Sequence, residues 1–221
     1  MNLGSDRALR VCVVGASRGS GRATVDALLA RGHEVVAFAR NMGGRVLAPR
    51  LTVVQGDALN LTDVESAVQG CGAVVVTLGI SENAVAVRLG IRHTPIDVRS
   101  RGTANVIAAM KHAGVRRLIV QSTYGIGESK GRLPVSGAIV FALLLAPQIQ
   151  DHERQETLVR ESGLDWTLVQ PVGLVDAENV GAAMVSVTGA AKGMKVSRAQ
   201  VAQVICDAVE GAFVRSTVAV S

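Results

Sequence analysis

The chain has 221 residues, of which 48% are apolar and 19% charged, a balance that excludes intrinsic disorder and permits a sizeable core. Its longest apolar run, residues 137–146, is too short to cross a bilayer, and its polar first residues do not resemble a signal peptide. The formal charge is +5, but aromatic residues make up only 2%, which disfavours nucleic-acid binding. We therefore expect a cytoplasmic protein that binds a phosphorylated small molecule, with no membrane partner.

The three cysteines, Cys12, Cys71 and Cys206, form neither a CxxC pair nor a cluster with histidines. Each lies among apolar neighbours, which is typical of reduced, buried cysteines. We expect no metal site.

Strand-like and helix-like segments alternate along the chain. The Val/Ile/Leu-rich runs are apolar throughout, which predicts strands covered on both faces, at residues 9–14, 35–39, 51–55, 73–78, 118–121 and 166–169. A capping box, Thr62 with Glu65, precedes one predicted helix, and Ser197 with Gln200 precedes another at 198–210. Helices at 105–113 and 151–162 end at Gly114 and Gly163. This alternation predicts an α/β fold with a Rossmann-like, doubly wound parallel sheet in a single domain over residues 1–221.

Two irregular insertions, near residues 81–95 and 125–150, follow predicted strands. Ligands of such sheets bind at the carboxyl ends of the strands, so both insertions are candidate pocket walls. The first half of the second insertion, residues 125–134, is glycine-rich and polar, which favours mobility. Residues 139–145 are apolar on every side, which suits either a helix buried in the core or at a subunit contact, or a flap over a substrate.

The strongest local signal is the glycine-rich turn after the first predicted strand. Its spacing is G-x-x-x-G-x-G, which differs from the ordinary dinucleotide fingerprint, but it lies between a strand and a helix as a phosphate-binding turn requires. A connection without a ligand is the alternative. We predict that the turn binds a pyrophosphate through Gly15, Ser17, Arg18, Gly19, Ser20 and Gly21.

The second predicted strand indicates which dinucleotide binds. Arg40 stands where an NAD site usually has an acidic residue, and an arginine suits the 2′-phosphate of NADP. Arg18 could reach the same phosphate, whereas Glu34 lies at the other end of the strand. NADP (NADPH) is therefore the predicted cofactor, with a solvated surface Arg40 as the alternative. Asp57 and Ala58 would lie near the adenine, and Leu78 and Gly79 beside a ribose, unless both pairs belong to ordinary turns.

Five segments in family order carry a resemblance to a known group: 13–21, 56–57, 105–111, 162–171 and 197–202. The chain resembles the NAD(P)H-binding, NmrA-like branch of the atypical short-chain dehydrogenases/reductases, and within it the biliverdin-IXβ reductase/flavin reductase type. Arg18 departs from that family, which usually has glycine there. The resemblance implies direct hydride transfer from NADPH to a flat, apolar, electron-poor molecule such as a flavin, quinone, tetrapyrrole or enone.

The resemblance also implies site residues. Ser122 and Thr123 match a hydroxyl position after the fifth strand, His152 matches a histidine at a helix start, and Pro171 matches a turn at the nicotinamide end. Tyr124 could belong to a Tyr-x-x-x-Lys acid, but Glu128 stands at the lysine position and Lys130 is out of register, so no group is evident to lower the tyrosine pKa. The alternatives are a redox-sensing regulator that binds NADP without turnover and a sugar epimerase or dehydratase. The chain could act as a monomer or homodimer.

Overall fold

In the computed structural model, the described residues are 8–43, 48–80, 87, 89–91, 93–133, 135–177 and 181–221, with the side chains of 135–145 and 147 outside the description. They form an eight-stranded sheet in the order β3-β2-β1-β4-β5-β6-β10-β8. All neighbouring pairs are parallel except the pair of β10 and β8. The strands are β1 (Arg10–Val14), β2 (Glu34–Ala39), β3 (Leu51–Gln55), β4 (Ala73–Val76), β5 (Arg117–Gln121), β6 (Asp165–Pro171), β8 (Val185–Ser186) and β10 (Ser216–Val220).

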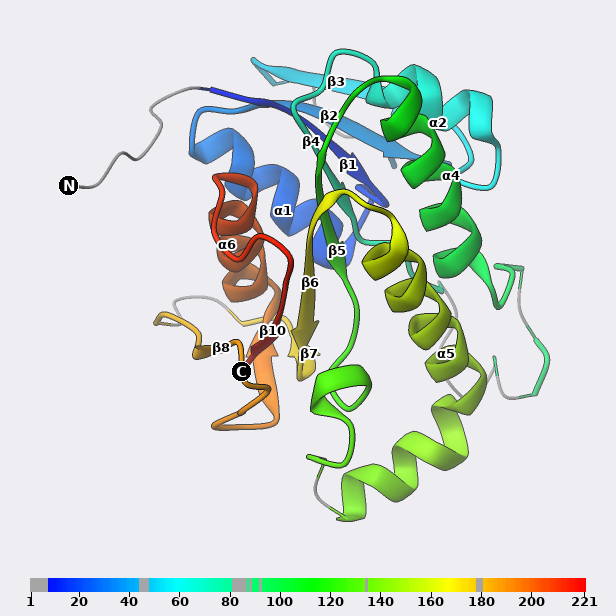
Figure 1. Ribbon diagram of the computed structural model, residues 1–221, viewed down its shortest axis with the longest axis vertical. Coiled ribbons are helices and arrows are strands. Elements are labelled where there is room, and N and C mark those ends of the chain that lie inside the picture. The colour runs from blue at the N-terminus through cyan, green and yellow to red at the C-terminus, as the bar shows by residue number, and fades with distance from the viewer. Residues whose placement is uncertain are drawn as a thin grey trace.

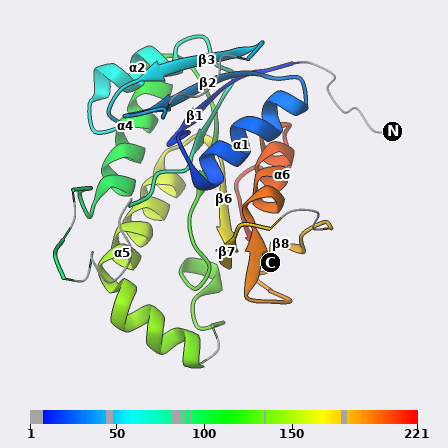
Figure 2. The same ribbon diagram turned by 180° about the vertical axis from the view of Figure 1, so that it is seen from behind.

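Helices cover both faces of this sheet, as Figures 1 and 2 show. On one face α1 (Gly19–Ala30) packs beside α6 (Arg198–Val209), and on the other α4 (Val98–His112) lies between α2 (Leu61–Val68) and α5 (Val135–Glu161). A hydrophobic core lies on each face of the sheet, and alternate residues of β1 contribute to each. Val11 and Val13 face α1 and α6, while Cys12 and Val14 face α2 and α4. The predicted Rossmann-like fold is confirmed.

The helix ends test the capping predictions. Gly114 and Gly163 have φ values of +69° and +73°, the left-handed conformation expected after a helix. Ser197 and Gln200 form both bonds of a capping box at α6. The box predicted at Thr62 is wrong, because Asn60 caps α2 by accepting the Thr62 N–H at 3.0 Å. Both α4 and α5 begin well before the segments predicted for them.

Short strands at the end of the chain escaped prediction. β10 lies beside β6, with Ser216 opposite Thr167, inside the sheet rather than at its edge. A small second sheet joins β7 (Gly173–Val175) to β9 (Lys195–Ser197) in parallel, directly before α6. Strand β7 follows the carboxyl end of β6, and its Gly173 and Leu174 line the cleft described below.

Part of the glycine-rich half of the second insertion is tied to the core by hydrogen bonds through Ser129. Its buried Ser129 accepts the Gly125 N–H at 2.8 Å and donates to Gln170 Oε1 at 2.7 Å. Gln170 in turn donates to Glu156 on α5 at 2.8 Å. The predicted helix at 139–145 is confirmed as part of α5, but its side chains lie outside the described residues, as does most of the insertion at 81–95.

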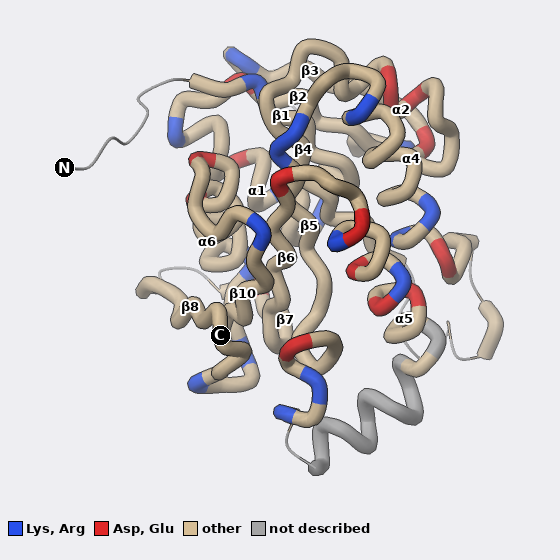
Figure 3. The backbone as a smooth tube through the Cα atoms, viewed as in Figure 1, with Lys and Arg blue, Asp and Glu red and all other residues tan. Residues whose placement is uncertain are grey.

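Charged residues are scattered over the fold. On the second half of α5, basic and acidic residues alternate, as Figure 3 shows. Among the described residues, no helix is both long and apolar enough to span a membrane.

Candidate active site

A cleft of about 1390 Å³ opens at the carboxyl ends of the parallel strands, the edge where doubly wound sheets bind ligands. The structure brings the predicted site residues together here from positions far apart in the chain. Those that line the cleft are Gly15, Ser17, Arg18, Gly19, Ser20, Arg40, Asp57, Ala58, Leu78, Gly79, Ser122, Thr123, Tyr124, His152 and Pro171. Gly21 does not line it, because it packs beneath the turn.

The glycines of the turn are required by close backbone packing. Gly15 has a φ of +93°, and a Cβ there would lie 2.8 Å from the Thr77 carbonyl oxygen. A Cβ at Gly21 would lie 2.1 Å from the Gly15 carbonyl oxygen. Thr77 fastens the turn by donating its hydroxyl to the Val14 carbonyl at 3.1 Å. Strand β1 is therefore joined to α1 through a turn that has no room for a side chain at Gly15 or Gly21.

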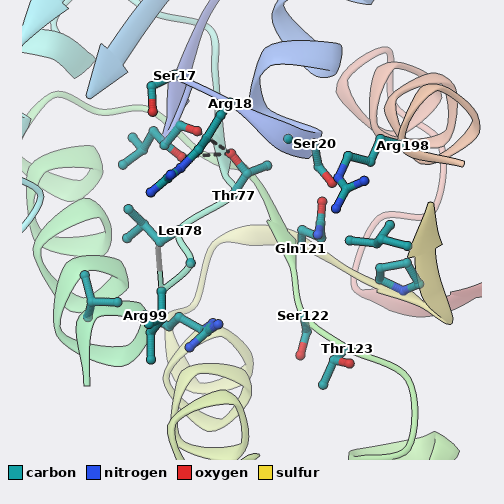
Figure 4. Close-up of a pocket in the computed structure, with 18 of the residues that line it drawn as sticks. Ser17, Arg18, Ser20, Thr77, Leu78, Arg99, Gln121, Ser122, Thr123 and Arg198 are labelled. Atoms are coloured by element: carbon teal, nitrogen blue, oxygen red, sulfur yellow. Dashed lines mark hydrogen bonds between the residues drawn. The ribbon is translucent and has the colours of Figure 1, made fainter. Parts of the chain in front are cut away.

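The first turn of α1 is suited to an anion. It contains no acidic residue, and no side chain caps it at Arg18. The buried Ser20 hydroxyl has no hydrogen-bond partner among the described residues and faces the cleft (Figure 4). Unpaired N–H groups and the helix dipole favour a phosphate at such a position. The uncapped start of α1, together with the unpartnered Ser20 hydroxyl, fits a dinucleotide pyrophosphate.

Arg40 follows β2 and lies exposed at the other side of the turn. Its Nη2 donates to Thr94 Oγ1 at 3.5 Å, while Glu34 occupies the far end of the strand. Among the described residues, no acidic side chain follows β2 at the position where an NAD ribose would be held. Asp57, after β3, lines the cleft, and its Oδ1 accepts the Leu59 N–H at 3.0 Å. This bond makes Asp57 part of a turn as well as of the cleft.

The hydroxyls after β5 have different surroundings. Ser122 Oγ is buried and lacks a hydrogen-bond partner among the described residues. Thr123 Oγ1 makes only a long contact of 3.5 Å with the Tyr124 carbonyl oxygen. The Tyr124 hydroxyl donates to the Gly189 carbonyl at 3.0 Å, and Lys130 pairs with Glu153 at 3.4 Å. The tyrosine and lysine therefore do not form a proton-donating pair.

His152, on α5, borders the same end of the cleft. Burial lowers its pKa well below the ordinary value, and the positive charge of Arg99 lowers it further, although a hydrogen bond with Gln155 opposes the shift. The ring is therefore neutral at pH 7, and its buried Nδ1 has no hydrogen-bond partner in the described part of the chain. An ordinary imidazole would titrate near neutrality, but the surroundings of His152 favour its neutral form.

Sequence reasoning missed Arg99, Gln121 and Arg198, which also line the cleft. Arg198 begins α6, where its Nη1 donates to Asp176 at 2.7 Å, and it lies near Gly19 of the turn. Of the seven described residues with unpartnered buried polar side-chain atoms, five line the cleft: Ser20, Arg99, Gln121, Ser122 and His152. Such atoms are rare in native cores, so their concentration marks a ligand-binding surface. No sequence motif around Arg99 or Gln121 predicts that either residue belongs to the site.

The fold and the glycine turn define an NAD(P)-binding protein of the Rossmann type. A family model described as NAD(P)H-binding matches residues 15–211, and the chain belongs to this family. The predicted membership of an NAD(P)H-binding family and the predicted Rossmann-like fold are thereby confirmed.

Solved structures share this fold. A short-chain dehydrogenase/reductase from Veillonella parvula in complex with NADP has a TM-score of 0.78 and 21% identity, with 97% of this chain and 95% of that chain covered. The anaerobilin reductase ChuY from Escherichia coli O157:H7 has a TM-score of 0.73 and 22% identity, with 96% of each chain covered. A curated relative, 3-beta-hydroxysteroid dehydrogenase from Mycolicibacterium neoaurum, is 34% identical over 119 residues, which are 53% of this chain and 32% of that protein.

Proposed function

We propose that this protein is an NADPH-dependent reductase that transfers hydride to a flat, apolar, electron-poor small molecule. The observation that carries the proposal is the cleft itself. One end is a phosphate cradle at α1, and the other presents the Ser122 hydroxyl and the neutral His152 ring without a tyrosine–lysine acid. The three similar proteins named above all have names of redox enzymes, which supports an oxidoreductase.

The residues of the cleft fit NADPH. Gly15, Gly19 and the Ser20 hydroxyl would hold the pyrophosphate, while Arg40, with Arg18, would hold the 2′-phosphate. Asp57, Ala58, Leu78 and Gly79 would line the adenosine and ribose positions, and Pro171 the nicotinamide end. When bound, the nicotinamide supplies the hydride.

The chain's own groups contribute mainly by positioning. Ser122 can donate a hydrogen bond to an acceptor atom of the substrate, and neutral His152 can accept or donate one at Nδ1. Tyr124 acts as a structural link, because its hydroxyl already binds the Gly189 carbonyl. Holding two flat rings in contact is then the principal source of catalysis, and water delivers the proton. We propose one such domain acting as a monomer or homodimer.

The test is oxidation of NADPH, followed by absorbance, in the presence of a flavin, a quinone or an enone. We expect steady turnover with at least one acceptor. Gly15→Ala should abolish it, because its Cβ would meet the Thr77 carbonyl. Gly70→Ala is the matched control: Gly70 also has a positive φ, of +71°, but nothing lies within 4 Å of an added Cβ.

Failure to oxidise NADPH, combined with tight binding of it, would contradict the reductase and favour a redox-sensing regulator. Retention of full activity in Gly15→Ala would show that the turn does not hold the cofactor. A cofactor that remains bound through purification and is not consumed would favour an epimerase or dehydratase.

A further inference from the structure

Arg99 is a buried cation that faces the proposed substrate end of the cleft. It is the second residue of α4, and its side chain is only 8% exposed. In Figure 4 its guanidinium points toward Ser122, well apart from Arg18 and Arg198 at the phosphate end. Nη2 lies beside Gly79, another residue of the cleft wall. Arg99 is therefore placed to meet a substrate rather than the cofactor phosphates.

The guanidinium of Arg99 is poorly satisfied by the described residues. Its Nε and Nη1 are buried without hydrogen-bond partners, and Nη2 makes one long bond of 3.4 Å to Gln148 Oε1. Burial lowers the Arg99 pKa, although Asp151 opposes this shift. A buried cation with so few bonds destabilises a fold unless a ligand completes its surroundings.

Asp151 is not the missing partner. Its two carboxylate oxygens already accept the backbone N–H groups of Arg99 and Ser100, at 3.0 and 3.1 Å. The Arg99 Nη1 lies 3.8 Å from Asp151 Oδ2, which is too far for a hydrogen bond. Asp151 thus offsets the charge of Arg99 while leaving its donors without acceptors.

The neighbours of Arg99 add hydrogen-bonding groups without adding negative charge. Ser122 can donate a hydrogen bond, and His152 is neutral because burial and Arg99 itself lower its pKa. The described lining of the cleft carries four arginines, Arg18, Arg40, Arg99 and Arg198, against two aspartates, Asp57 and Asp176. Asp176 is already paired with Arg198. Three of these arginines lie at the phosphate end, so the positive charge of the described lining at the substrate end comes from Arg99, whose Nη1 lies 3.8 Å from Asp151, a residue outside that lining.

We propose that the substrate carries a carboxylate and that Arg99, with Ser122, binds it. A guanidinium presents paired donors that match the two oxygens of a carboxylate, and charge-assisted bonds of this kind are stronger than neutral ones. This inference rests on the proposed function, because only the proposed reductase activity makes the ligand of Arg99 a substrate. It narrows the substrate from flat, apolar acceptors in general to those bearing an acid group.

The test uses 2-naphthoate and its neutral counterpart 2-naphthamide, titrated by calorimetry into the protein with and without NADP⁺. We expect naphthoate to bind at least about tenfold more tightly, the effect of one charge-assisted bond. Arg99→Met should abolish the preference, and Arg99→Lys should keep part of it, because it retains the charge but not the paired donors. Arg101→Met is the matched control, since Arg101 is exposed on the same helix and outside the cleft lining.

Equal affinities of the wild-type protein for the two probes would overturn the proposal, as would no naphthoate binding at all, and neither result depends on the folding of a variant. A preference that survives in Arg99→Met would also overturn it. A tenfold loss of NADP⁺ affinity in Arg99→Met would assign Arg99 to the cofactor instead. The readout is binding, so a protein that prefers naphthoate but oxidises no NADPH would disprove the proposed reductase and leave the carboxylate site standing.

Discussion

Arg117 and Arg99 lie at opposite ends of the parallel strands. Both guanidinium groups are at least partly buried, but they differ in how many hydrogen bonds they make. Arg117 begins β5, and its guanidinium donates to the Asp165, Ala208 and Ala212 carbonyls and to the Thr167 hydroxyl, at 2.6–2.9 Å. Arg99, at the carboxyl edge, makes one hydrogen bond of 3.4 Å. Burial lowers the pKa of both, that of Arg117 to about 10.

The difference in hydrogen bonding distinguishes an arginine that stabilises the fold from one that is available to a ligand. Arg117 joins the last turn of α6 to the starts of β5 and β6, so its guanidinium N–H groups stabilise the fold. Arg99 and the four other residues of the cleft lining with unpartnered atoms have polar atoms that remain for a ligand. Unsatisfied polar atoms are tolerated at a site because a ligand stabilises them and the rest of the core compensates.

The largest effect is expected at Arg117. Arg117→Met leaves three backbone carbonyls without their donor, and we expect unfolding to become easier by about 3 kcal/mol in urea denaturation. Arg116→Met is the control, because Arg116 is exposed beside it and pairs only at the surface; its denaturation midpoint should hardly move. Equal midpoints for the two variants would contradict the structural role of Arg117.

At the cleft, Arg40→Asp should remove most of the preference for NADPH over NADH. A charge-assisted bond to the 2′-phosphate contributes about 10–100-fold in affinity. Dissociation constants measured by calorimetry for both cofactors test this, and Arg154→Asp, the same charge change on the exposed side of α5, should leave the ratio unaltered. Equal affinities in the wild-type protein would disprove NADP selectivity.

His152 should make the protein sensitive to acid. Its folded-state pKa is depressed, so the unfolded chain binds its proton first as the pH falls below about 6.5. Stability is then lost with falling pH, by at most about 1.4 kcal/mol per unit for this group. His152→Gln should reduce the difference between urea midpoints at pH 7.5 and pH 5. A pH dependence as steep as that of the wild type would argue against a buried neutral ring.

The smallest effect is expected at Tyr124. Because its hydroxyl binds the Gly189 carbonyl and no lysine accompanies it, Tyr124→Phe should lower the maximal rate of NADPH oxidation by less than about tenfold. Ser122→Ala should lower it by as much or more. A thousandfold loss in Tyr124→Phe would restore the tyrosine as the proton donor.

Local patterns were sufficient to predict most of the fold. Continuous apolar runs identified the six strands from β1 to β6, and left-handed glycines identified two helix ends, because burial on both faces and a positive φ each demand particular residues. The short strand β10 escaped, since its five residues resemble many exposed segments until β6 is placed beside them. The wrong cap at Thr62 has a similar cause: Asn60 and Thr62 are both good caps, and only the backbone path selects between them.

The sequence by itself determined the NAD(P)-binding fold and the glycine turn at one end of the cleft, because the glycines, the strand and the helix of that turn are contiguous. Only the tertiary structure decided the substrate end. Arg99 and Asp151 are 52 residues apart, and the neutral state of His152 depends on burial and on the charge of Arg99. Desolvation and unmatched donors arise from packing between α4, α5 and β5, so no local pattern of residues could have revealed them.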